Sequence, residues 1–301
     1  MERAFITGIE GFTGRYLSSE LRSAGYEVTG TQMPRAEANI TDAYLCDLCD
    51  RNATKGVLAQ ARPDVVVHLA GIAYVGHGDV DAIYRANVVG TRNLLEAIST
   101  CGHAPRVVLL ASSSNIYGNA TAGIFDESTP PAPANDYAVS KLAMEFMAKL
   151  WSDKLPITIV RPFNYTGVGQ STQFLLPKIV EHFKARAPVL ELGNLDVVRD
   201  FSDVREVVSC YRRLLQIGQE AMVRGEAFNI CSGVGHSLHE VIGMMHAISG
   251  HSLKVIVNPA LIRSNEVHKL IGTRAKLEAT IGLVKPISIK ETLQWMLEAA
   301  H

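Results

Sequence analysis

The chain has 301 residues, 47% of them hydrophobic and 20% charged, which supports a sizeable core and excludes an intrinsically disordered chain. The 29 basic and 30 acidic residues leave a net charge of −1, which argues against binding nucleic acid through a broad basic face. The five cysteines are scattered, no leader peptide opens the sequence and no apolar run approaches the roughly 20 residues of a membrane span, so we expect a cytoplasmic protein.

The first half of the chain alternates between short apolar runs and helical patterns. Two runs, Val65–Leu69 and Val107–Leu110, are apolar on both faces, which is typical of parallel strands covered by helices. We predict strands at Arg3–Thr7, Glu27–Thr31, Ala43–Leu48, Asp64–Leu69, Arg106–Ser112 and Ile157–Val160. The helices expected between them are Thr13–Ala24, Arg51–Ala61, Val80–Cys101 and Asp136–Trp151. This alternation predicts an α/β fold with a doubly wound parallel sheet of the Rossmann type.

The second half has a different rhythm and predicts a smaller, mixed α/β lobe. Its expected helices are Phe174–Arg186, Val204–Ile217, Ser237–Ser249 and Ile289–Ala300, and its expected strands are Val189–Leu192, Ala227–Cys231 and Leu253–Val257. We therefore predict a dinucleotide-binding domain at 1–165 and a lobe that is mainly substrate-binding at 166–301. Segments near 195–232 are candidates for a return to the first sheet.

A glycine-rich turn joins the first predicted strand to the first helix. Glycine permits unusual φ angles and a close approach of backbone to phosphate, and the helix N-terminus offers free N–H groups to a pyrophosphate. Three glycines alone also occur in purely structural turns, but their place at the start of a βα series favours a dinucleotide site. The expected contacts are Gly8, Gly11, Phe12, Thr13 and Gly14.

The segment after the second strand bears on the choice of cofactor. A carboxylate there would bind the ribose 2′-hydroxyl of NAD, but Val28–Arg35 contains no acid. Arg35 is within reach of a 2′-phosphate, so NADP(H) is the preferred prediction and NAD(H) the alternative, in which Arg35 is a solvated loop cation. Asp47 and Leu48, which end the third strand, are expected to face the adenine, unless Asp47 is simply solvated.

Tyr137 and Lys141 are four residues apart, on one face of a predicted helix. A tyrosine with a pKa of about 10 is a poor acid–base group at neutral pH, and a neighbouring ammonium lowers that pKa. Such a pair can exchange a proton with a carbonyl or an alcohol. The turn Ser112–Gly118 follows the fifth strand, where ligands of parallel sheets bind; its alternative role is to cap the strand end.

Together these motifs resemble the extended short-chain dehydrogenase/reductases that act on nucleotide sugars. The other matches are His68-Leu69-Ala70, Asn87 and the Ser-x-x-x-Tyr-Gly turn ending at Tyr117-Gly118. The resemblance implies that Tyr137 is the acid–base residue, Lys141 a ribose-binding group that modulates its pKa, and Ser113 the hydroxyl partner. It also implies cofactor contacts from Leu69, Ala70, Gly71 and Asn87, and a homodimer. Asn87 is further expected to support the helix and a proton path.

The second half resembles the family members that reduce GDP-4-keto-6-deoxy-D-mannose. The matching stretches are 161–164, 167–170, 193–204, 228–233 and 263–267. The resemblance implies nucleotide contacts from Asn164, Arg199, Arg263 and Glu266. Guanidinium groups suit a pyrophosphate because they bind it through two hydrogen bonds. The alternative for Arg199 and Arg263 is surface pairing with Asp200 or Glu266.

The expected activity is NADPH-dependent reduction of the C4 ketone of that keto sugar to GDP-D-rhamnose. The alternatives are a reductase that forms GDP-6-deoxy-D-talose, a nucleotide-sugar 4-epimerase with tightly bound NAD, and a non-catalytic nucleotide sensor. In related 4,6-dehydratases a general base stands two residues before the tyrosine of the Ser/Thr-x-x-x-Tyr-Gly turn; here that residue is Asn115. No metal site is expected, because Cys46-x-x-Cys49 has no second ligand pair.

Overall fold

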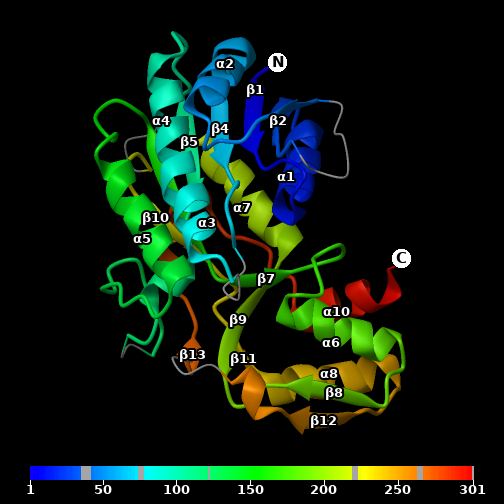
Figure 1. Ribbon diagram of the computed structural model, residues 1–301. Helices are drawn as coiled ribbons and strands as arrows, with labels where there is room; N and C mark the ends of the chain where they lie inside the picture. Colours follow the sequence, from blue (N-terminus) through cyan, green and yellow to red (C-terminus); the bar gives the residue numbers. More distant parts are fainter. Residues whose placement is uncertain (35–41, 74–77, 121–122, 219–222, 263–266, 300–301) are drawn as a thin grey trace.

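The computed structural model describes residues 1–34, 42–73, 78–120, 123–218, 223–262 and 267–299. Its largest element is a seven-stranded parallel sheet in the order β10-β6-β5-β4-β1-β2-β3 (Figure 1). The strands are β1 (Arg3–Thr7), β2 (Glu27–Gln32), β3 (Ala43–Leu45), β4 (Val65–His68), β5 (Val107–Ala111), β6 (Ile157–Pro162) and β10 (Ala227–Ile230). The predicted Rossmann-type fold is confirmed.

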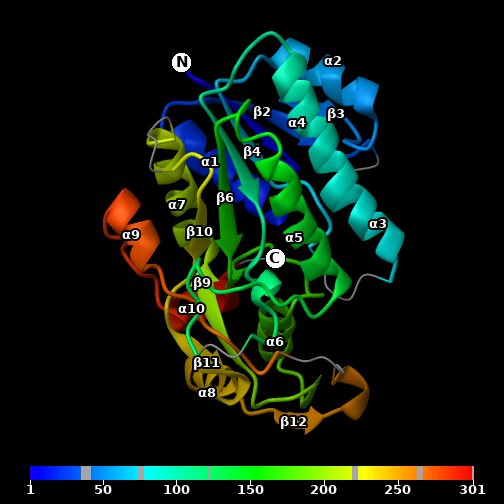
Figure 2. The same ribbon diagram turned by 90° about the vertical axis from the view of Figure 1, so that its left-hand side faces the viewer.

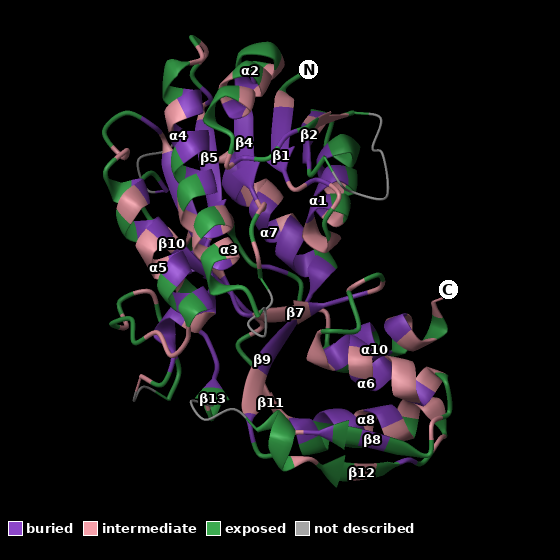
Figure 3. Cartoon of the chain, in the orientation of Figure 1, coloured by how far each residue is buried: buried purple, intermediate pink, exposed green. Residues whose placement is uncertain are grey.

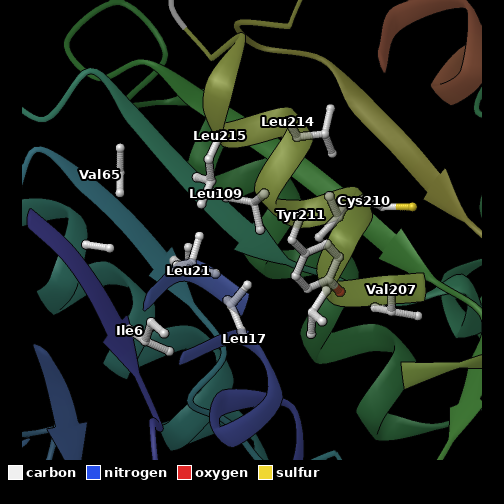
Figure 4. Packing of buried hydrophobic residues seen from close by; sticks show 14 of the residues in the cluster. Ile6, Leu17, Leu21, Val65, Leu109, Val207, Cys210, Tyr211, Leu214 and Leu215 are labelled. Atoms are coloured by element: carbon white, nitrogen blue, oxygen red, sulfur yellow. The ribbon is translucent and has the colours of Figure 1, made fainter. Parts of the chain in front are cut away.

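Helices cover both faces of this sheet because neighbouring strand residues point to opposite faces. On one face α1 (Phe12–Ser23) and α7 (Val204–Gln216) bury Leu17, Leu21 and Tyr211 in one hydrophobic cluster with Ile6 (Figure 4). On the other face α2 (Arg51–Ala61), α4 (Thr91–Thr100) and α5 (Asp136–Lys149) lie over Phe5 (Figure 2). The central strands are therefore buried on both sides, as their apolar runs predicted (Figure 3).

The long helix predicted at Val80–Cys101 is interrupted. It consists of α3 (Val80–Tyr84), a π-helical segment Arg85–Gly90 and α4. The widened turn contains Asn87, whose side chain is buried. The strand predicted at Ala43–Leu48 ends at Leu45, because the chain then turns toward α2, where the Asp50 side chain accepts hydrogen bonds from the backbone N–H groups of Asn52 and Ala53.

The smaller lobe lies below the sheet in Figure 1 and encloses its own core. Its helices are α6 (Leu175–Lys184), α8 (Leu238–Ser249) and α10 (Ile289–Glu298), beside the paired strands β8 (Val189–Leu192) and β12 (Lys254–Val257). A second group of strands joins it to the sheet domain: β7 (Asn164–Thr166), β9 (Val198–Asp203), β11 (Gly235–Ser237) and β13 (Lys269–Leu270).

After β9 the chain returns to the sheet domain. Helix α7 packs against α1, β10 pairs with the edge strand β6, and α9 (Ala275–Ile281) packs against β10 and α7. The domain division at residues 165 and 166 stays a prediction. Within the described residues, none of the helices is long and apolar enough to cross a membrane.

Candidate active site

The glycine turn is held against the end of β2. The backbone N–H groups of Gly8 and Ile9 both donate to the Thr31 carbonyl oxygen, at 3.0 Å each. A Cβ on Gly14 would lie 2.4 Å from the Gly8 carbonyl oxygen, so only glycine fits there. Gly11 precedes α1 and provides no side-chain cap, which leaves the N–H groups of the first helical turn for another acceptor. This turn fits the pyrophosphate of a dinucleotide.

The side chains that follow the turn connect it to β7. The hydroxyls of Thr13 and Tyr165 lie 2.7 Å apart, and the rings of Phe12 and Tyr165 stack with their centroids 6.1 Å apart. Tyr165 is a residue that sequence reasoning did not select. Its only signal in the sequence is its position directly after Asn164, a predicted substrate contact.

A second loop, at the end of β4, lies beside the glycine turn. The Thr7 hydroxyl oxygen accepts from the N–H groups of Leu69 at 3.2 Å and Ala70 at 3.1 Å. A Cβ on Gly8 would lie 3.1 Å from the Ala70 Cα, and a Cβ on Gly71 would lie 3.6 Å from the Lys141 Nζ. Of the predicted contacts, Ala70 is therefore close to the glycine turn and Gly71 to Lys141, while Leu69 is held on Thr7 at the end of β1.

Asn87 links this loop to helix α5. Its Oδ1 accepts from the Ile72 N–H at 2.9 Å, and its Nδ2 donates to the Ile72 carbonyl at 3.1 Å and to the Ser140 hydroxyl at 3.0 Å. Ser140 in turn donates to the Tyr137 carbonyl at 2.7 Å. These contacts hold the backbone of α5 at the loop. They account for a positioning role of Asn87, and its part in a proton path stays a prediction.

The structure brings Ser113, Tyr137 and Lys141 together beyond the end of β5, and all three are buried. The Asn135 side chain caps α5, so Tyr137 lies in its first turn and Lys141 one turn later. Lys141 Nζ donates to the Ala111 carbonyl at 2.8 Å. Burial raises the pKa of Tyr137 to about 12, and a hydrogen bond with Ser113 acts against that rise, so the lowering of this pKa predicted from Lys141 is not found. Burial lowers the pKa of Lys141 to about 8, against the attraction of Glu145.

The hydrogen bonds of Ser113 indicate where its hydroxyl proton points. Its Oγ accepts from the backbone N–H and from the side-chain Nδ2 of Asn115, at 3.1 Å each. A serine hydroxyl has two acceptor positions and one donor. With both acceptor positions engaged, the O–H of Ser113 is left to donate toward Tyr137 or a bound carbonyl group. Asn115 thus supports Ser113, a role that the sequence did not suggest.

A buried ion pair involves Glu145, one helical turn after Lys141 on α5. Arg161 donates to the Glu145 carboxylate through Nε at 3.0 Å and Nη2 at 2.7 Å, and through Nη1 to the Tyr117 hydroxyl at 3.0 Å. Tyr117 donates to Asn229 Oδ1 at 2.8 Å. The spacing of Tyr137, Lys141 and Glu145, one helical turn after another, is a signal that could have identified Glu145.

Two of the predicted nucleotide contacts, Asn164 and Arg199, lie at the junction of the two lobes. Asn164 Nδ2 donates to the Asp200 carbonyl at 3.3 Å, and Arg199 Nη1 donates to the carbonyls of Val198 at 3.0 Å and His268 at 3.2 Å. The buried Asp200 carboxylate accepts from the backbone N–H groups of Ser232 at 2.8 Å and Gly233 at 2.9 Å. These bonds hold the loop after β10 against β9. Arg263 and Glu266 lie outside the described residues.

The predicted adenine contacts engage in local hydrogen bonds. Asp47 Oδ1 accepts from the Cys49 N–H at 2.9 Å, and the Leu48 carbonyl accepts from Asn93 Nδ2 at 2.9 Å. Their contact with adenine stays a prediction. Arg35, the predicted partner of a 2′-phosphate, lies outside the described residues.

Comparison with known sequences matches residues 4–231 to the NAD dependent epimerase/dehydratase family. The chain belongs to this family. The predicted resemblance, the fold class and the assignment as an enzyme are thereby confirmed. Of the described site residues, Ser232, Gly233 and His268 lie outside the matched range.

Two relatives of known activity are each 33% identical to the chain. One is a GDP-6-deoxy-D-talose 4-dehydrogenase of Aggregatibacter actinomycetemcomitans, with 93% of this chain and 91% of the relative covered. The other is a GDP-6-deoxy-D-mannose reductase of Pseudomonas aeruginosa, with 98% and 96% covered. A solved structure, RMD from Pseudomonas aeruginosa complexed with NADPH, is 31% identical with a TM-score of 0.85, and covers 99% of this chain and 98% of its own.

Proposed function

We propose that this protein reduces the C4 ketone of GDP-4-keto-6-deoxy-D-mannose to GDP-D-rhamnose with a reduced nicotinamide dinucleotide. The observation that carries the proposal is the assembly of Ser113, Tyr137 and Lys141 beside a glycine turn that fits a pyrophosphate. The relatives named for GDP-6-deoxy sugars support the substrate class. We further propose that Asn164, Arg199, Arg263 and Glu266 bind the nucleotide.

The chemistry divides between cofactor and chain. A bound nicotinamide dinucleotide supplies the hydride for C4. Ser113 donates its free hydrogen to the ketone oxygen and polarises it, and Tyr137 gives its phenolic proton to the same oxygen as it becomes an alcohol. With a pKa raised to about 12, Tyr137 holds that proton at neutral pH. Lys141, one turn further along α5, would bind the cofactor ribose and stabilise the phenolate after proton transfer.

Dehydration is not part of the proposed reaction. Removal of the C5 proton needs a general base, and the residue at the corresponding position is Asn115, whose amide cannot accept a proton at neutral pH. Its Nδ2 is hydrogen-bonded to Ser113 at 3.1 Å. We therefore expect the protein to consume a 4-keto-6-deoxy sugar made by a separate enzyme, and not to convert GDP-mannose.

The C4 epimer of the product is the second candidate. The relatives named for the talose and the mannose configurations are equally identical to this chain, at 33%. The face of C4 that receives the hydride decides between GDP-D-rhamnose and GDP-6-deoxy-D-talose. Chromatography of the product against both standards distinguishes them. An epimerase would instead interconvert C4 epimers without net consumption of cofactor.

The cofactor preference has arguments on both sides. Arg35, and the relative solved with NADPH, support the predicted preference for NADP(H). An acidic side chain at the end of β2 would support NAD(H), and Glu10 lies there with its Oε1 3.0 Å from the Met33 nitrogen. The proposed reaction itself proceeds with either dinucleotide.

We also propose that two copies of the chain form a dimer through α3, α5 and the π-helical segment. These neighbouring elements, with the residue after α5, carry several exposed apolar side chains, and a patch of such side chains favours a protein interface. They are Val80, Val89, Val139, Phe146 and Leu150.

Replacement of Tyr137 by phenylalanine tests the catalytic assignment. The change removes only a hydroxyl, so the fold and cofactor affinity should persist while kcat falls by about 10²–10⁴-fold. Turnover with the keto sugar and the dissociation constant of the cofactor are measured in parallel. Tyr44→Phe, a matched change on β3 away from the site, should leave both values unchanged. Near-normal turnover in Tyr137→Phe would refute the role of Tyr137.

A further inference from the structure

The glycine turn places an acidic residue beside the end of β2, where the strand itself has no acid. Glu10 stands inside the turn, between Ile9 and Gly11. Because the N–H groups of Gly8 and Ile9 are fixed on the Thr31 carbonyl, the next residue lies beside the end of β2. Glu10 Oε1 accepts a hydrogen bond there from the Met33 N–H at 3.0 Å. A search for an acid along the strand alone could not have found this contact.

The other oxygen of the same carboxylate lacks a partner. Four buried side-chain polar atoms of the described residues have no hydrogen-bond partner, and Glu10 Oε2 is the carboxylate oxygen among them. A buried acceptor without a donor is unfavourable, more so when it is charged. Oε1 is fixed by Met33, which restricts the carboxylate to one orientation. Because Oε2 is itself buried, a further donor can reach the carboxylate only at Oε1, whose hydrogen bond with Met33 is exposed, at the end of β2.

The adenosine ribose of a bound dinucleotide supplies such a donor. In sheets of this type the ribose lies at the end of the second strand, and a carboxylate there accepts from its 2′-hydroxyl. A 2′-phosphate offers an anion at the same position, which a carboxylate repels. We propose that Glu10 selects the unphosphorylated ribose and that the protein therefore prefers NADH to NADPH. This inference rests on the proposed dinucleotide site and reverses the preference predicted from Arg35.

The relative solved with NADPH does not decide the question for this chain. At 31% identity about two of three residues differ, and cofactor choice depends on individual side chains around the 2′ position. Arg35 could bind a phosphate only if the repulsion from Glu10 were overcome. The contribution of each residue can be separated by substitution.

The direct test measures binding without turnover. ADP-ribose and its 2′-phosphorylated form differ only at the 2′ position, and their dissociation constants are measured by titration calorimetry for the wild type and for Glu10→Gln. We expect the wild type to bind ADP-ribose at least about tenfold more tightly. A hydrogen bond to a charged group contributes about 1.5–3 kcal/mol, so Glu10→Gln should weaken ADP-ribose by roughly tenfold or more. The same change should strengthen binding of the phosphorylated form.

Two matched variants complete the experiment. Glu27→Gln removes an exposed acid from the opposite end of β2 and should change neither constant. Arg35→Ala should have little effect on ADP-ribose. Tighter binding of the phosphorylated form by the wild type, or equal changes for both ligands in Glu10→Gln, would overturn the proposal. Because no sugar is present, a failure of the proposed reductase activity would leave this result unaffected, and the reverse also holds.

Discussion

At the scale of single residues, the hydrogen bonds around His68 assign its protonation state. Thr91 donates its hydroxyl proton to the Asn87 carbonyl at 2.7 Å, so it accepts from His68 Nε2, which lies 2.8 Å away. Nδ1 is then an acceptor, and the Thr7 hydroxyl, 2.7 Å away, donates to it. The imidazole is therefore neutral. Burial, with a smaller effect of Lys141, lowers the pKa of His68 to about 3.

This arrangement predicts a loss of stability in mild acid. His68 has a pKa near 6.5 in the unfolded chain and a much lower one in the fold, so protons bind preferentially to the unfolded state. Its contribution is fully present above pH 6.5 and declines as the pH falls toward 3. In His68→Gln the free energy of unfolding, measured with urea, should depend less on pH below 6.5.

The matched control is His239→Gln, because the His239 side chain is 62% exposed. This variant should keep the wild-type dependence on pH. If His68→Gln and the wild type lose stability in parallel between pH 6.5 and 5, the neutral state of His68 does not contribute to acid sensitivity.

At the scale of the elements, α5 aligns Tyr137, Lys141 and Glu145 on one face. The last of these forms a buried pair with Arg161 on β6, at 2.7 Å. Removal of one partner of a buried pair leaves an uncompensated charge and costs about 3–5 kcal/mol. We therefore expect Glu145→Gln to lower the free energy of unfolding by several kcal/mol.

Glu226→Gln serves as the comparison for that change. Its partner Lys276 lies 2.6 Å away, but both side chains are substantially exposed, and exposed pairs contribute about 0–1 kcal/mol. Urea denaturation of both variants measures the difference. Equal losses would show that burial of the Glu145–Arg161 pair has no special effect on stability.

The elements also show which features the sequence could predict. The sheet strands follow from apolar runs, and the Tyr137–Lys141 pair from local spacing, both of which depend on near neighbours, whereas Ser113 is implied by the family resemblance. Strand β9 was missed because charged residues interrupt its apolar pattern, although Phe201 and Ser202 are buried. The π-helical segment was also missed, because Asn87 owes its place to Ile72 and Ser140, which are distant in sequence. Glu10 reaches β2 by the same kind of long-range contact.

At the scale of the whole molecule, the proposed dimer makes a specific prediction. Phe146 on α5 is 57% exposed and Leu150, just after it, is 80% exposed. A charge at each position would disfavour burial against a second copy. Light scattering should therefore find a dimer for the wild type and a monomer for Phe146→Glu combined with Leu150→Glu.

Leu283→Glu is the control for this surface. Leu283 is 82% exposed but follows α9, on the opposite side of the sheet from α5. This variant should remain dimeric. A monomeric wild type, or a dimer that survives both charges on α5, would contradict the proposed interface.

The most direct test of the central claim supplies the purified protein with GDP-4-keto-6-deoxy-D-mannose and either NADH or NADPH. Loss of nicotinamide absorbance is compared with the amount of 6-deoxyhexose product separated by chromatography. A reductase consumes one cofactor for each alcohol formed, and GDP-mannose in place of the keto sugar should give no reaction. Interconversion of C4 epimers without net cofactor consumption, dehydration of GDP-mannose, or inertness toward the keto sugar would contradict the account.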